Sequence, residues 1–155
     1  MTKLKVLVHE SKDPIIPPYK EKYDETFIHF QLVVLLTKSI RKKIFIKLGE
    51  AQLTKHLDGT HELAWLEIAE NRRHAGLGRY LLDSITNYCD KLLKPIELYL
   101  VEEKKNISLV DFYTKAGFVL LNFDEFNNIA HMVRPSNLKF SLKTYHTLLN
   151  TNCNI

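Results

Sequence analysis

The stretch of sequence that decides the fold runs from Leu63 to Asp83 and reads LAWLEIAENRRHAGLGRYLLD. It passes from a mostly apolar segment into a charged turn, then two glycines, and then apolar residues at helical spacing. We therefore predict a strand, a loop and a helix, with RHAGLG at residues 73–78 forming the junction. Glycines let a backbone pass close to a ligand, and the first turn of a helix has N–H groups without intrahelical partners. Together with the helix dipole, these groups form a site for a phosphate or pyrophosphate.

The junction does not match the two most familiar phosphate-binding loops. It lacks the Lys-Ser/Thr pair of a nucleotide-triphosphate loop. It also has one glycine too few for the dinucleotide fingerprint, and we expect no parallel strand with an acidic residue at the ribose distance. Taken alone, the motif is equally consistent with a tight strand-to-helix turn that binds no ligand.

Composition favours one globular domain, because the chain has 155 residues and 45% of them are hydrophobic. The net charge of +4 is mild and would help a phosphate-bearing ligand approach. It does not by itself indicate nucleic acid, and no pattern of interleaved aromatic and basic residues supports base stacking. The N-terminus lacks the apolar region of a signal peptide, and no run approaches the roughly 18 apolar residues of a membrane span. We therefore expect a cytoplasmic protein that does not enter the membrane.

The cysteines and histidines give no sign of a disulfide framework or a metal site. The two cysteines, Cys89 and Cys153, lack the spacing of metal ligands, and so do the histidines. Cys89 falls within a predicted helix, where we expect it to be a small buried side chain rather than a nucleophile.

Alternating and β-branched patterns before the junction predict strands at 3–9, 27–36, 44–53 and 62–69, of which three or four are antiparallel neighbours in a row. The segment 11–20 carries three of the five prolines, so we expect an ordered loop followed by at most a short turn at 19–25. A basic turn is expected at 37–43, and Asp58-Gly59 is expected to break the chain before the fourth strand.

After the junction the pattern changes to helical spacing, and we predict three elements before Gly117 and two after it. The predicted elements are a helix from 77 that ends at Lys94-Pro95, a strand at 96–101, a helix at 107–116 capped by Asn106 and closed by Gly117, and a hairpin of strands 118–123 and 129–133 across Asn127-Asn128. Residues 1–135 are predicted to form a single domain. The tail, 136–155, is expected to be a weak helix around 140–149 or largely disordered.

About thirty residues after Gly78 lies a second motif, NISLVDFYTKAGF at residues 106–118. At this point the sequence resembles the GNAT superfamily of acyl-CoA-dependent N-acetyltransferases. In that family motif A is a strand followed by Arg/Gln-x-x-Gly-x-Gly/Ala at a helix start, as at 73–78. Motif B is a strand, an Asn and a helix that ends in Phe/Leu-Tyr-x-x-x-Gly-Phe, as at 106–118. Both motifs occur in order over 27–133, and the joint match is much more specific than either half.

The resemblance implies an α+β fold: a mixed, mostly antiparallel seven-stranded sheet that is splayed in the middle, with helices on both faces. It implies acetyl-CoA as the acyl donor, bound in a slot between the strands 62–69 and 96–101. The implied contacts are the pyrophosphate loop Arg73, His74, Ala75, Gly76, Leu77 and Gly78, with Arg79 close behind; the strand backbone Ile68, Ala69 and Glu70, which pairs with the pantetheine arm; and Asn106 and Tyr113, near the pantetheine and the thioester sulfur.

Acetyl transfer needs a neutral amine, a polarised thioester carbonyl and a proton for the departing thiolate. The resemblance places Tyr113 as the general acid, and this role is favoured over the alternative of an aromatic residue buried in the core. Glu62, eleven positions before Arg73, is the candidate general base, and its alternative is a solvated charge at the start of a strand. The two-residue strand period predicts that Glu62 shares a face with Leu66 and Ile68 and that Trp65 points the other way. His61 is a further candidate, and many members of the family have no dedicated base.

We therefore predict transfer of an acetyl group from acetyl-CoA to a primary amine of a small molecule or of a peptide or protein, by direct attack in a ternary complex. The main alternative is a CoA-binding regulatory module that has lost catalysis, and a nucleic-acid-associated role receives little weight. The acceptor is unidentified, and a homodimer is possible. Acceptor choice is expected to depend on 14–25 and 124–128, and the first of these is short and rich in proline, which would leave the acceptor side open.

Overall fold

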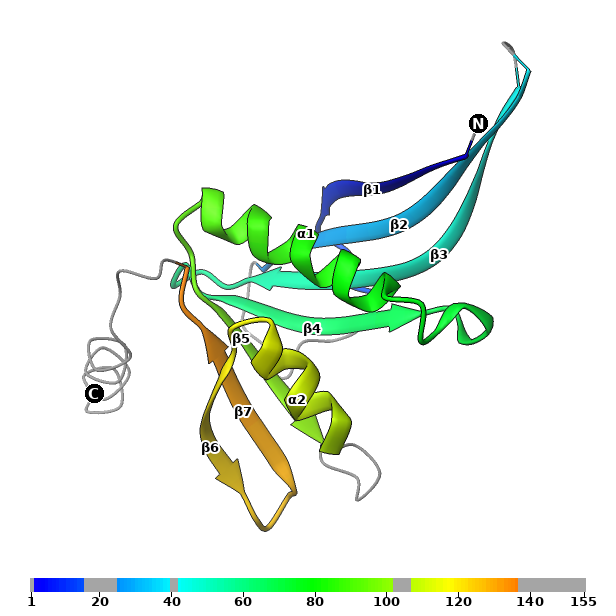
Figure 1. The fold of residues 1–155 in the computed structure, drawn as a ribbon. Coiled ribbons are helices and arrows are strands. Elements are labelled where there is room, and N and C mark those ends of the chain that lie inside the picture. The colour runs from blue at the N-terminus through cyan, green and yellow to red at the C-terminus, as the bar shows by residue number, and fades with distance from the viewer. Residues whose placement is uncertain (1, 16–24, 40–41, 102–106, 137–155) are drawn as a thin grey trace.

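The computed structural model describes residues 2–15, 25–39, 42–101 and 107–136 (Figure 1). Within these ranges the elements are β1 (Thr2–Ser11), β2 (Thr26–Ser39), β3 (Lys42–Lys55), β4 (His61–Ile68), the 3₁₀ helix η1 (Glu70–Arg72), α1 (Leu77–Lys91), β5 (Ile96–Val101), α2 (Ile107–Lys115), β6 (Val119–Asp124) and β7 (Ile129–Arg134). The seven strands form one sheet in the order β1-β2-β3-β4-β5-β7-β6.

The sheet is mixed and splayed, as predicted. Neighbouring strands are antiparallel except β4 and β5, which are parallel. In the described part of the chain, β4 and β5 pair at only two positions, His61 with Ile96 and Glu62 with Glu97. Beyond this point the two strands diverge, and the sheet opens between them (Figure 1).

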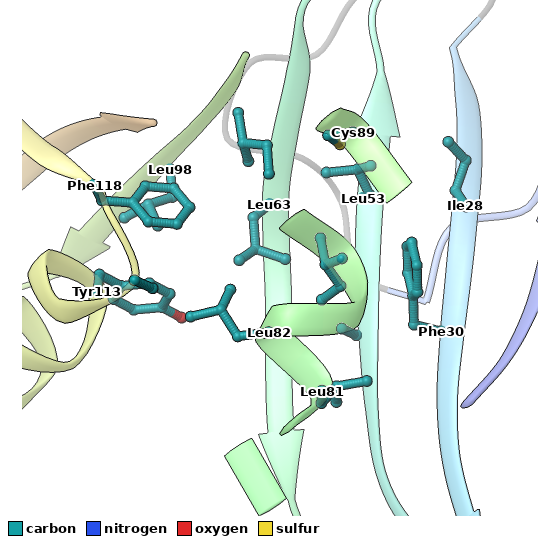
Figure 2. Close-up of a cluster of buried hydrophobic side chains, with 14 of the residues drawn as sticks. Ile28, Phe30, Leu53, Leu63, Leu81, Leu82, Cys89, Leu98, Tyr113 and Phe118 are labelled. Atoms are coloured by element: carbon teal, nitrogen blue, oxygen red, sulfur yellow. The ribbon is translucent and has the colours of Figure 1, made fainter. Parts of the chain in front are cut away.

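Both helices lie on the same face of the sheet, which we call the helix face (Figure 1). Leu81 and Leu82 of α1 and Tyr113 of α2 belong to one buried cluster with Leu63 of β4 and Leu98 of β5 (Figure 2). Burying such side chains is the main stabilising contribution to a fold of this size. The predicted second layer of helices is not found among the described residues, because both helices contribute to this single core.

A bulge in β4 overturns the predicted facing of Glu62. Gln52 pairs with Trp65 while its neighbour Leu53 pairs with Leu63, so one extra residue stands in β4 between the two pairs. Paired residues share a face, and a single extra residue reverses the facing of everything before it. Leu63 faces the helices (Figure 2), and Glu62 therefore points to the opposite face, together with Trp65.

Most local predictions agree with the structure, and one turn is shorter than expected. β2 continues to Ser39 and β3 begins at Lys42, so most of the predicted basic turn belongs to the strands. Gly117 has a φ of 92° after α2, and Asn128 has a φ of 53° in the β6–β7 turn, as their turn roles require. Cys89 is buried on α1, and burial raises the pKa of its thiol to about 12, which keeps it protonated.

Several predictions lie outside the described residues: most of the turn at 19–25, the helix cap at Asn106 and the tail beyond 136. None of the described helices combines the length and the apolar character that crossing a membrane requires.

Candidate active site

A cavity of about 540 Å³ opens on the helix face where β4 and β5 diverge. Leu66 and Ile68 of β4 contribute to its wall, and so do Phe112 and Tyr113 of α2. The rest of the lining comes from Arg72, Arg73, His74, Gly76, Gly78, Arg79 and Leu109. The structure thus brings together seven of the sequence-predicted ligand residues: Ile68, Arg73, His74, Gly76, Gly78, Arg79 and Tyr113. Ala69, Glu70, Ala75 and Leu77 neighbour this lining in the chain.

The N-terminus of α1 lies at the cavity, because Gly76 and Gly78 belong to the cavity lining. Gly76 is the N-cap residue with a φ of 76°, and no side chain caps the helix. The first intrahelical hydrogen bond runs from the Tyr80 N–H to the Gly76 carbonyl oxygen, at 3.0 Å. The N–H groups of the preceding residues in the turn are therefore available to an anion, and the helix dipole favours negative charge there.

Close packing explains the second glycine of the junction. A Cβ at Gly78 would lie 3.6 Å from the Phe112 ring and 3.7 Å from an Ile68 side-chain carbon. The start of α1 therefore lies against both α2 and the end of β4, and the helix N-terminus stands beside the splay.

Three arginines give this region a positive charge. The Arg73 Nε donates to the Ile68 carbonyl oxygen at 3.1 Å, and its Nη2 lies 3.5 Å from the Glu67 carboxylate. Arg79 pairs with Asp83 at 2.8 Å on the surface of α1. Both side chains remain about half exposed, so they can reorient toward a phosphate-bearing ligand.

Tyr113 lies in the wall of the cavity and is only 7% exposed. Its ring packs edge-on against Phe112 and Phe118, and its hydroxyl is directed toward α1 (Figure 2). Burial raises the pKa of this phenol to about 12, so it carries its proton throughout the neutral range. A protonated hydroxyl beside the cavity can donate to an anion that forms there.

Glu62 lies on the opposite face of the sheet, outside the lining of this cavity, and is 1% exposed. Its Oε2 lies 3.0 Å from the Nε2 of His56, and the Nδ1 of His56 lies 2.9 Å from Oε1 of Glu25. Glu62, followed by Glu25, raises the pKa of His56, against the opposing effect of burial. Sequence reasoning missed this cluster because its three residues have no common spacing.

A second ionisable cluster occupies the same face on the other side of the splay. The Tyr99 hydroxyl donates to Glu97 Oε2 at 3.3 Å, and the Nε2 of His131 lies 3.1 Å from the same oxygen. The His131 ring stacks on Tyr99 with a centroid separation of 4.5 Å. The strand period of β5 places Glu97 and Tyr99 on one face and could have indicated this pair, whereas the contribution of β7 needed the sheet order.

His61, the further candidate base, is the first residue of β4, as predicted, but its side chain is buried. It is 1% exposed, and its Nδ1 lies 3.1 Å from the Gly59 carbonyl oxygen. Burial is the main cause that lowers its pKa, so the ring is held neutral in the core. No cluster of three His, Cys, Asp or Glu side chains suited to a metal ion occurs in the described ranges.

Comparison with known proteins identifies the fold and the family. The chain resembles the ribosomal-protein-S18-alanine N-acetyltransferase from Escherichia coli, with 18% identity over 75% of this chain and 73% of that one and a TM-score of 0.55. It also resembles a candidate streptothricin acetyltransferase from Bacillus anthracis in complex with acetyl coenzyme A, with 14% identity over 84% of this chain and 98% of that one and a TM-score of 0.53. No curated protein matches the sequence.

The sequence model of the acetyltransferase (GNAT) family matches residues 10–118. This match covers more than half of the chain, and it includes motif A at 73–78, motif B at 106–118 and every residue that lines the cavity described above. The chain therefore belongs to the acetyltransferase (GNAT) family.

Proposed function

We propose that this protein transfers an acetyl group from acetyl-CoA to a primary amine of a small molecule, peptide or protein, by direct attack in a ternary complex. The observation that carries the proposal is the cavity at the splay, where a helix N-terminus, positive side chains and a protonated Tyr113 meet. The similar Bacillus anthracis structure, which holds acetyl coenzyme A, supports the choice of donor.

In this proposal the donor occupies the cavity in an extended form. Its pyrophosphate binds at residues 73–79, against the first turn of α1 and the arginines. Its pantetheine arm runs along the backbone of residues 68–70, past the point where β4 stops pairing with β5. We also assign a pantetheine contact to Asn106, which lies outside the described residues.

The chemistry divides between the two faces of the sheet. The amine nitrogen attacks the thioester carbonyl carbon, and strand N–H groups stabilise the oxyanion that forms. The C–S bond then breaks, Tyr113 gives its proton to the departing thiolate, and the excess proton on the acylated nitrogen returns to Tyr113, which leaves a neutral amide and free CoA. Glu62 takes the proton of the ammonium form of the acceptor. Because this carboxylate is 1% exposed, the proton reaches it through water.

One observation favours a second candidate, a CoA-binding module without catalysis. Glu62 is buried and engaged by His56, so it does not stand open to an acceptor as a solvent-facing base would. Such a module would bind acetyl-CoA and release no free CoA in the presence of any amine.

Two measurements test the proposal. Acetyl-CoA at about 100 times its dissociation constant should stabilise the folded protein by about 2.7 kcal/mol and raise its melting temperature. Free CoA should then appear when a panel of amines is supplied. Stabilisation without turnover supports the binding module, and a melting temperature that acetyl-CoA does not change contradicts both candidates.

A matched pair of variants locates the pyrophosphate. Gly76 has a positive φ, a conformation that Asn and Asp tolerate better than other side chains. Gly76→Asn and Gly76→Asp therefore have similar backbone strain and differ in charge. We expect Gly76→Asp to lose acetyl-CoA affinity about tenfold or more relative to Gly76→Asn, because like charges repel. Equal affinities would move the pyrophosphate away from this helix start.

A further inference from the structure

The cluster on the face opposite the helices is closed and rigid around one histidine. The two ring nitrogens of His56 lie 2.9 Å from Glu25 and 3.0 Å from Glu62, and all three side chains are buried. The backbone of His56 is also fixed, because its N–H donates to the Thr60 carbonyl at 2.9 Å and its carbonyl accepts from the Gly59 N–H at 3.0 Å. The imidazole is therefore held at both ring nitrogens and extends from a backbone that the β3–β4 turn fixes.

Counting protons shows that this cluster holds one more proton than an ordinary histidine–carboxylate pair. A neutral imidazole carries a single N–H, and its other nitrogen offers a lone pair. An ionised carboxylate only accepts hydrogen bonds. If His56 were neutral, the lone pair of its second nitrogen would therefore face a carboxylate oxygen with no proton between them. The cluster thus contains either an imidazolium between two carboxylates or a neutral imidazole beside one carboxylic acid.

The imidazolium form is the one that the surroundings favour. The two carboxylates raise the pKa of His56, Glu62 being the larger cause and burial opposing both. Among the described residues, the other ionisable groups nearby are His61, on the opposite side of β4, Glu97 with its partner His131, beside Glu62 on β5, and Lys12, whose Nζ donates to the backbone carbonyl of Glu25 at 3.5 Å. His61 is held neutral, so it adds no positive charge that would displace the proton from His56.

We propose that His56, with Glu25 behind it, is a positioning residue that keeps Glu62 ionised inside the sheet and ready to accept the proton of the acceptor amine. This inference rests on the proposed function, in which Glu62 is the base. The proton leaves the ammonium nitrogen, passes through water and bonds to the Glu62 carboxylate, while both ring protons remain on His56. Release of that proton to solvent restores the starting state, and no other reactant is needed.

The first test is the pH dependence of kcat at saturating acetyl-CoA and acceptor, which reports the base in the ternary complex. His56→Gln should move the acid limb of kcat to higher pH by about one unit or more, because the buried carboxylate loses its cationic partner. Binding of acetyl-CoA should stay within about twofold of the wild type, since the donor cavity lies on the other face. His131→Gln is the matched control: it removes a histidine from a carboxylate on the same face and should leave the limb in place.

The inference is overturned if the acid limb of the kcat profile does not move in His56→Gln. It is also overturned if that limb moves only in His131→Gln. These outcomes differ from failure of the proposed function, which shows as absent turnover with every amine in the wild-type protein.

The second test requires no turnover and no substitution at His56, so it remains valid if His56→Gln does not fold. Nitrogen chemical shifts of the histidine rings should show both nitrogens of His56 protonated in the wild-type protein at pH 7.5. Glu25→Gln keeps an acceptor oxygen for Nδ1 and removes one negative charge, so His56 should lose its proton at a lower pH than in the wild type. A neutral His56 ring at pH 7.5 in the wild type, or an unchanged titration in Glu25→Gln, contradicts the inference.

Discussion

At the scale of single residues, the bulge at Ala64 determines which face receives Glu62. The two-residue period correctly groups Leu66 with Ile68, and both line the cavity. It fails for Glu62 because one extra residue separates it from that group in the β3–β4 ladder. The sequence around residue 64 does not indicate a bulge, since alanine is compatible with both a regular and a bulged strand backbone.

At the same scale, the contact between Glu25 and His56 could not be predicted from the sequence. They are 31 positions apart, and neither belongs to a motif. Their contact follows only from the pairing of β2 with β3, which places Thr26 opposite Lys55. Tyr113, in contrast, was predictable because it belongs to a motif with fixed spacing on a single helix.

Tyr113→Phe isolates the hydroxyl of the proposed acid. We expect kcat to fall about 10²-fold or more, the usual contribution of a positioned general acid. The ring and its packing remain, so the shift in melting temperature produced by acetyl-CoA should stay close to the wild-type value. Because the pKa of the phenol is about 12, no loss of activity between pH 7 and 10 should depend on this residue. Turnover that equals the wild type would remove Tyr113 from the acid role.

At the scale of helices and strands, prediction succeeded wherever one period ran between clear breaks. The strand at 96–101 was predicted with its observed bounds, because Pro95 and a charged run enclose an apolar segment. The helix α1 likewise runs from Leu77 to Lys91, between a glycine and the Lys94-Pro95 pair. The side on which each helix packs was not predictable from such patterns, because it depends on how β4 connects to β5 through α1.

One arginine joins the ends of three of these elements. Arg134 of β7 donates through Nη1 and Nη2 to the two Asp90 oxygens in the last turn of α1, at 2.7 and 3.0 Å. Its Nε donates to the Ala116 carbonyl at the end of α2, at 3.0 Å. The planar guanidinium makes all three contacts at once, which a lysine ammonium cannot do.

Arg134→Lys should therefore lower the free energy of unfolding by about 1–2 kcal/mol, measured by urea denaturation. Arg79→Lys is the control, since its pair with Asp83 is exposed and should contribute less than about 0.5 kcal/mol. Equal losses in the two variants would show that the junction at Arg134 adds no more than a surface ion pair.

At the scale of the whole molecule, buried histidines whose pKa values are shifted in opposite directions determine how stability depends on pH. Burial lowers the pKa of His29 and of His61, so their contributions are present above the unfolded pKa of 6.5 and are lost as the pH falls through the folded value. The raised pKa of His56 has the opposite sign: its contribution is present below 6.5 and is lost as the pH rises through the folded value.

His61→Leu tests the first of these signs. The variant removes a buried group that must become charged in acid, and its side chain suits the interior position. We expect its free energy of unfolding to fall less than that of the wild type between pH 7.5 and pH 5, as measured by urea denaturation at both pH values. A steeper loss in the variant would contradict the lowered pKa of His61.

The divergence of β4 and β5 has a consequence for the borders of the sheet. A continuous sheet exposes backbone groups only along its two outer borders, here β1 and β6. This sheet has two additional borders in its middle, one on β4 and one on β5, because the described pairing between these strands ends after two residue pairs. Unpaired borders of this kind are templates for other extended chains. Under the proposed function, a donor whose arm lies along β4 shields one of them, and acyl-CoA would then protect this protein against aggregation.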